Sequence, residues 1–77
     1  MQQTYKGYRL HSAAAGVRNT NAWKPISQVN WKEHGEERVK LWMEWHFQDT
    51  FASYEEAELA GLVFAKKWVD DQTNRKE

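Results

Sequence analysis

Apolar and polar side chains alternate over three stretches of the chain, and this alternation predicts three β-strands. The stretches are residues 5–11, 23–32 and 37–47. A period of two is the spacing at which successive side chains point to opposite faces of a sheet. Residues 12–21, between the first two strands, are rich in small and turn-forming side chains, so we expect a mobile loop there.

The third of these strands has the clearest alternation. Its apolar positions are Val39, Leu41, Met43, Trp45 and Phe47. They alternate with Arg38, Lys40, Trp42, Glu44 and His46. Apolar residues that stay in step over a whole strand predict that the first set faces the core. The turn before this strand, Glu33-His34-Gly35-Glu36, supplies a glycine where a positive φ is expected.

A helix is predicted over residues 54–71. Ser53 and Glu56 have the spacing of a capping box, in which the Ser hydroxyl accepts a hydrogen bond from a helix amide and the Glu side chain reaches back. One stripe at helical spacing begins with small residues, which would let the helix lie close to the sheet. The stripe consists of Ala57, Ala60, Gly61, Phe64 and Trp68. Residues 72–77 are polar and predict a frayed tail.

Together these elements predict a single α+β domain over residues 1–77. We expect a three-stranded antiparallel β-meander packed on one face by a C-terminal α-helix, with the other face left open. The side chains expected beneath the helix are Tyr8, Leu10, Val29, Trp31, Val39, Leu41, Met43 and Trp45. Those expected on the open face are Arg9, His11, Lys24, Gln28, Asn30, Lys32, Arg38, Lys40 and Trp42.

Composition narrows the class of protein. The chain has 77 residues, enough for one domain, and its 11 aromatic side chains can fill a small core. It has no Cys, which excludes disulfides and thiolate metal sites within it. No apolar run is long enough to cross a bilayer, and the first residues lack the pattern of a secretion signal. We therefore expect a cytoplasmic protein without a membrane partner.

Charge is distributed unevenly along the chain. Residues 1–32 contain five basic side chains and no Asp or Glu, whereas all 11 acidic residues follow from Glu33 onward. The two parts thus carry net charges of +5 and −5, although the whole chain is neutral. Such asymmetry predicts a charged partner better than the net charge does.

The sequence predicts no catalytic, metal or cofactor site. His11, His34 and His46 lack the spacing of metal ligands, and the glycines are isolated, so there is no phosphate-binding loop. Glu44 and His46 lie two residues apart, as a carboxylate that orients an imidazole would. No nucleophile or third ligand accompanies this pair, so we interpret it as a surface pair and expect no enzyme.

The open sheet face is the predicted binding surface. Its basic side chains can neutralise phosphates, its amides can read base edges, and an exposed Trp can stack. Duplex DNA is therefore one expected partner. A solvated polar face is the alternative without a ligand. A third possibility is a protein partner, or self-association, through Trp42 and an unpaired strand edge.

Short motifs resemble known families. The stretches DTFASYEEA (residues 49–57) and AKKWVDDQ (residues 65–72) resemble the small bacterial HlyU-like family, as does YKGYRL at residues 5–10. That family is labelled a transcriptional activator, so the resemblance implies a bacterial regulatory protein. The segment FASYEEA (residues 51–57) is also similar to AP2-type and integrase N-terminal DNA-binding domains, which place a sheet in the major groove. That resemblance implies DNA contacts from Arg9, Lys24, Arg38, Lys40 and Trp42.

Overall fold

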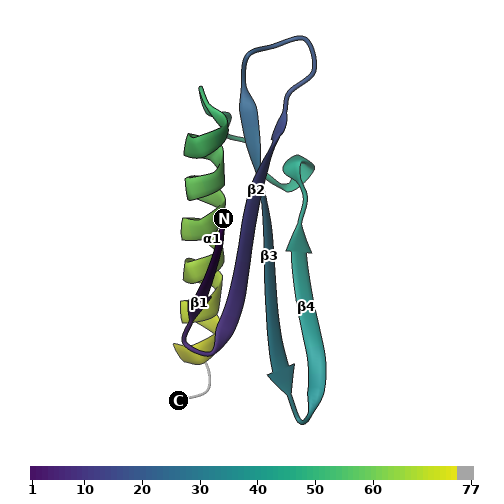
Figure 1. Cartoon of the computed structure of the whole chain (residues 1–77), viewed down its shortest axis with the longest axis vertical. Coiled ribbons are helices and arrows are strands. Elements are labelled where there is room, and N and C mark those ends of the chain that lie inside the picture. The colour runs from purple at the N-terminus through teal and green to yellow at the C-terminus, as the bar shows by residue number, and fades with distance from the viewer. Residues whose placement is uncertain (75–77) are drawn as a thin grey trace.

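The computed structural model describes residues 1–74 and contains an antiparallel sheet with one long helix against one face (Figure 1). The strands are β1 (Gln2–Tyr5), β2 (Tyr8–Gly16), β3 (Trp23–Glu33) and β4 (Glu36–Trp42), paired in chain order. A 3-10 helix, η1 (Glu44–His46), and the helix α1 (Tyr54–Asn74) follow. The α+β class and the C-terminal helix are confirmed. The prediction of three strands is wrong, because the sheet of the described residues has four.

The additional strand arises from a tight turn inside the first predicted strand. Lys6 and Gly7 have φ angles of 52° and 83°, and Tyr5 pairs with Tyr8 across them. A two-residue turn with positive φ at both positions reverses the chain, so β1 and β2 form a hairpin. The sheet also extends further than expected: β2 continues to Gly16, which reduces the predicted loop 12–21 to residues 17–22.

The hairpin between β3 and β4 sets the face of every β4 side chain. His34 and Gly35 have φ angles of 53° and 80°, and Glu33 pairs with Glu36 around them. Counting outward from this pair, Ser27 stands opposite Trp42. Because paired residues share a face, Trp42 points toward the helix.

The predicted orientation of the third strand is therefore wrong. Trp42 is only 9% exposed, whereas Val39 is 60% and Leu41 is 46% exposed. The strand ends at Trp42, and the residues expected to continue it form η1, in which Trp45 is exposed. Alternation is present as predicted, but its phase is opposite: the Val39 and Leu41 positions face away from the helix.

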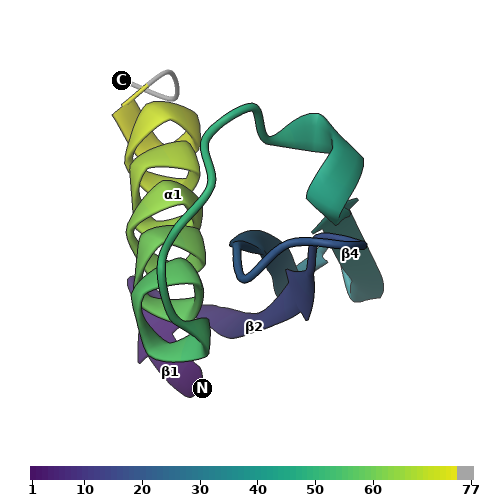
Figure 2. The ribbon, with the colours of Figure 1, turned by 90° about the horizontal axis from the view of Figure 1, so that it is seen from above.

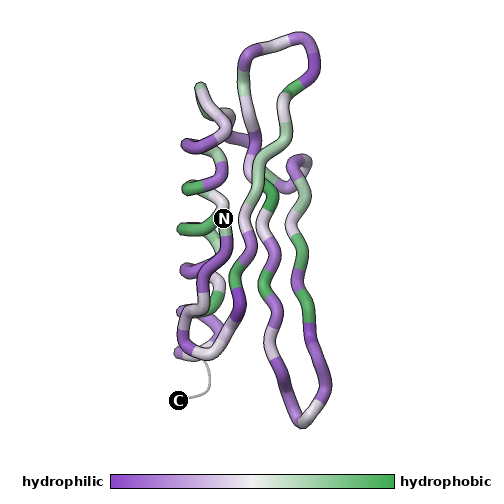
Figure 3. The backbone as a smooth tube through the Cα atoms, viewed as in Figure 1, coloured by the Kyte–Doolittle hydropathy of each residue, from purple (hydrophilic) through white to green (hydrophobic). Residues whose placement is uncertain are grey.

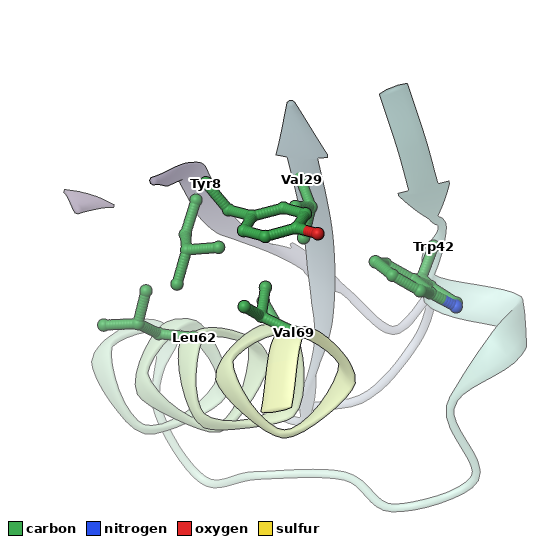
Figure 4. Packing of buried hydrophobic residues seen from close by; sticks show 7 residues of the cluster. Tyr8, Val29, Trp42, Leu62 and Val69 are labelled. Atoms are coloured by element: carbon green, nitrogen blue, oxygen red, sulfur yellow. The ribbon is translucent and has the colours of Figure 1, made fainter. Parts of the chain in front are cut away.

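Packing of large rings explains this phase. The Trp42 ring makes edge contacts with Phe64 and Trp68 of α1, at centroid distances of 5.1 and 5.5 Å. In Figure 4 its indole lies on the same side of the sheet as Tyr8 and Val29. Burying a Trp ring removes more apolar area from water than burying a Val or Leu would.

The helix covers only part of the sheet. It packs on β2 and β3, and β4 lies farthest from it (Figure 2). Two β4 residues on the helix side of the sheet, Arg38 and Lys40, therefore lie beyond the edge of the helix. Their side chains stay exposed. The buried core consists of Tyr8, Leu10, Val29, Trp42, Leu62, Ala65 and Val69.

Small residues bring α1 close to the sheet near its middle. A Cβ atom placed on Gly61 would lie 2.6 Å from Ser12 Oγ and 2.9 Å from Ser27 Oγ. The Ser12 hydroxyl donates to the Glu58 carbonyl oxygen (2.5 Å), and the Ser27 hydroxyl donates to that of Gly61 (2.7 Å). Gly61 is therefore a contact point where only a hydrogen atom fits, as the small-residue stripe predicted.

The helix begins as predicted and extends beyond its predicted end. The Glu56 amide donates to Ser53 Oγ (3.2 Å), and the Glu56 carboxylate accepts from the amide of Ala52 (3.3 Å). Helical structure continues to Asn74, three residues beyond the predicted end near Asp71, so residues 72–74 of the predicted tail are helical. The rest of the predicted tail, residues 75–77, lies outside the described residues.

Candidate partner-binding face

The sheet face turned away from α1 is the candidate binding surface, and we call it the uncovered face. Strand register and alternation define its members. Its charged and polar members are Gln2, Thr4, Arg9, His11, Lys24, Gln28, Asn30, Lys32 and Glu37. Its apolar members are Ala13, Ala15, Ile26, Val39 and Leu41.

The structure brings together six of the nine predicted site residues on this face. They are Arg9, His11, Lys24, Gln28, Asn30 and Lys32. Three others are on the helix side of the sheet instead: Arg38, Lys40 and Trp42. The Lys40 ammonium there lies 5.9 Å from the centroid of the Trp42 ring, a cation–π distance. Trp42 therefore does not offer an exposed stacking ring on the uncovered face.

Some of the polar groups on the uncovered face already have partners. The Arg9 guanidinium donates to the Glu37 carboxylate across β3. The Gln28 amide donates to the Asn30 side-chain oxygen at 2.7 Å. The Arg9–Glu37 pair is neutral, so Lys24 and Lys32 carry the net positive charge. These two lysines lie near opposite ends of β3, about 26 Å apart at the rise of an extended strand.

The middle of the uncovered face is apolar, which the sequence did not predict. Val39 and Leu41 of β4 are exposed to solvent, and Figure 3 shows that hydrophobic and hydrophilic residues alternate along this strand. Beside Leu41 a shallow hollow of about 140 Å³ is bordered by Ala13 and Ile26. Exposed apolar side chains that cluster on one surface are typical of an interaction site.

One edge of this surface is an unpaired strand. β4 is the last strand of the sheet, and its side chains from Glu36 to Leu41 are all exposed. An exposed edge presents N–H and C=O groups that a further strand can pair with. The edge and the apolar centre adjoin, because Val39 and Leu41 belong to β4 itself.

A polar cluster on the other side of the molecule ties the β1–β2 turn to α1. The Tyr5 hydroxyl donates to the Asp70 carboxylate (2.8 Å), and the Lys6 ammonium lies 2.7 Å from the same carboxylate. Hydrogen bonds from Lys6 and from Tyr5 lower the pKa of Asp70. The hydrogen bond to Asp70 raises the pKa of Tyr5. This cluster fastens the sheet to the helix.

Residues 1–74 contain neither a metal-binding cluster nor a helix suited to span a membrane. No three His, Asp or Glu side chains among them are grouped to hold a metal ion. No helix in that part of the chain has the length and apolar composition that a membrane span requires.

Comparison with known proteins adds no relative. No protein-family model, curated protein or solved structure matches the chain. The resemblances to the HlyU-like family and to the AP2-type and integrase domains therefore stay predictions.

Proposed function

We propose that this chain is a small binding module, not an enzyme, and that its uncovered face binds an extended segment of another protein. The observation that carries the proposal is the exposure of Val39 and Leu41 beside an unpaired strand edge. A strand that pairs with β4 would gain main-chain hydrogen bonds. Its side chains on one face would then stand beside Val39 and Leu41 and pack against them.

The charges around the apolar centre define the chemistry of the partner. Lys24 and Lys32 flank it, and the Arg9–Glu37 pair adds no net charge. A partner segment with apolar side chains between Asp or Glu residues complements this arrangement. Exposed charges of this kind affect association rate and specificity more than affinity.

Selection of peptides from a random displayed library tests this proposal. We expect the selected peptides to be apolar with flanking carboxylates, and to lose affinity when a central residue is replaced by proline, which removes a main-chain donor. Binding should be lost in Val39→Asp and Leu41→Asp. It should persist in Val63→Asp, a matched control because Val63 is 58% exposed on α1. Selected peptides that bind Val39→Asp and the wild type equally would contradict the proposal.

Nucleic acid is a second candidate, favoured by one observation. Lys24 and Lys32 share the uncovered face with the amide side chains of Gln28 and Asn30. Lysines can contact phosphates, and amides can contact base edges. Titration with duplex DNA by fluorescence anisotropy tests this candidate. If the chain binds DNA through this face, the affinity should fall steeply as salt concentration rises, and the double variant Lys24→Gln/Lys32→Gln should reduce it. Peptide binding through Val39 should instead vary little with salt.

A further inference from the structure

The outer side of α1 carries a second exposed apolar surface, separate from the uncovered face. Leu59 is 54% and Val63 is 58% exposed, although the opposite side of the helix is buried against the sheet. In Figure 3 hydrophobic segments recur on the side of α1 that is turned away from the sheet. The strands β1 to β4 leave this side of the helix uncovered.

The apolar side chains line a hollow at the surface. Its volume is about 490 Å³, and its walls are Phe51, Glu56, Leu59, Ala60 and Val63. Glu56, Leu59, Ala60 and Val63 follow the i, i+3, i+4, i+7 pattern, so they form one stripe. Lys67 follows Val63 by one more turn on the same stripe and is exposed. The outer stripe of α1 is therefore apolar in the middle, with the acidic Glu56 before the apolar part, the basic Lys67 after it, and Asp71 one turn beyond Lys67.

This stripe is complementary to an antiparallel copy of itself. Glu56 and Lys67 are equally far from the midpoint between Gly61 and Leu62, and about 16 Å from each other along the helix. A two-fold axis at that level would place Glu56 of each copy opposite Lys67 of the other. Leu59 of each copy would meet Val63 of the other and enter the hollow. A parallel arrangement would instead set Glu56 against Glu56.

We propose that the outer stripe of α1 is the interface of a symmetric, antiparallel homodimer. The charge arrangement selects a second copy as the occupant, because a two-fold interface requires self-complementarity. Helices of this length in contact along one stripe bury less area than a standard interface of about 1,600 Å². We therefore expect a weak, reversible dimer with a dissociation constant on the order of tens of micromolar.

Sedimentation equilibrium over a wide range of protein concentration tests the dimer. The wild type should shift from monomer to dimer, and Leu59→Asp should remain monomeric with affinity reduced by at least about a hundredfold. Val39→Asp should dimerise like the wild type. A wild type that is monomeric even at millimolar concentration, or a dimer that Leu59→Asp leaves intact, would overturn the proposal. A dimer abolished by Val39→Asp would overturn it too, by moving the contact to the uncovered face.

Charge reversal tests the antiparallel orientation. Lys67→Glu and Glu56→Lys should each weaken the dimer by about tenfold, because each sets like charges together in two symmetric places. The double variant Glu56→Lys/Lys67→Glu should recover wild-type affinity. It also lacks the Glu56 contact with the Ala52 amide, so recovery cannot come from the helix cap. Glu55→Lys is the matched control and should dimerise normally, because Glu55 is exposed but lies off the stripe. Failure of the double variant to recover would contradict the antiparallel pairing.

Discussion

Trp42 stands opposite Ser27 on the helix side of the sheet, and this pairing turns Val39 and Leu41 to the uncovered face. The indole of Trp42 is in contact with the rings of Phe64 and Trp68. One register thus decides two properties of the molecule: which ring closes the core and which side chains a partner would meet.

Truncation of Trp42 and of Val39 should have very different effects on stability. Trp42→Ala should lower the free energy of unfolding by about 3–5 kcal/mol, because it removes a buried ring and leaves a cavity. Val39→Ala should change it by less than about 0.5 kcal/mol, because the side chain is exposed. Urea unfolding followed by circular dichroism measures both. Equal losses in the two variants would contradict the register.

The absence of cysteine allows a direct test of side-chain orientation. Val39→Cys and Val29→Cys are conservative changes on neighbouring strands, and Val29 is fully buried. In the native protein a thiol reagent should label position 39 rapidly. Position 29 should react only through transient opening of the structure. Comparable labelling rates in native buffer would be inconsistent with the fold, provided that both variants give the wild-type circular dichroism spectrum.

Gly61→Ala should destabilise the protein, although alanine favours a helix more than glycine does. The added methyl group would overlap the hydroxyls of Ser12 and Ser27, which both donate hydrogen bonds to α1. We expect a loss of about 1–3 kcal/mol in the free energy of unfolding. In a double-mutant cycle, Gly61→Ala should cost less in the Ser27→Ala background, because one of the two overlaps is gone. An unchanged or increased stability of Gly61→Ala would refute the close approach.

The cluster of Tyr5, Lys6 and Asp70 should make stability depend on pH at both extremes. The pKa of Asp70 is lowered below its ordinary value of 3.8, so its contribution is present above that pH and is lost as pH falls through the folded-state pKa. The pKa of Tyr5 is raised above its ordinary value of 10.0, so its contribution is present below that pH and is lost as pH rises through the folded-state pKa.

Asp70→Asn isolates this contribution. The difference in unfolding free energy between wild type and Asp70→Asn should be largest near neutral pH and should shrink at both ends. Tyr5→Phe should reduce the alkaline change, and it should keep the part of the acid change that comes from Lys6. A wild-type to Asp70→Asn difference that stays constant from acid to alkaline pH would show that the cluster is not formed in solution.

The fold class and the start of the helix could be predicted because each rests on a local signal. The capping pattern at Ser53 and Glu56 placed the first helical residue correctly. Small residues on the helix stripe predicted to face the sheet indicated the close contact at Gly61. The division of the first strand was missed, although Lys6-Gly7 is a two-residue turn that needs a positive φ. Glycine at the second turn position was the available signal.

The phase of β4 could not be predicted from its alternation. Val39 and Leu41 lie on one face of the strand, and Trp42 lies on the other. Either face could therefore supply apolar side chains to the core. The hairpin turn carried the missing information. With His34 and Gly35 as its two loop residues, Glu33 pairs with Glu36 and the register leads to Trp42 beside Ser27. Turn length decides the face of a strand when composition does not. The apolar centre of the candidate site was missed for the same reason.

The central claim is that the uncovered face binds an extended segment of a protein. Amide chemical-shift mapping during titration with a selected peptide tests it most directly. We expect the largest shifts in β4 (Glu36–Trp42) and in the neighbouring part of β3, together with protection of β4 amides from hydrogen exchange. Shifts confined to the outer stripe of α1, with β4 amides unchanged, would contradict it.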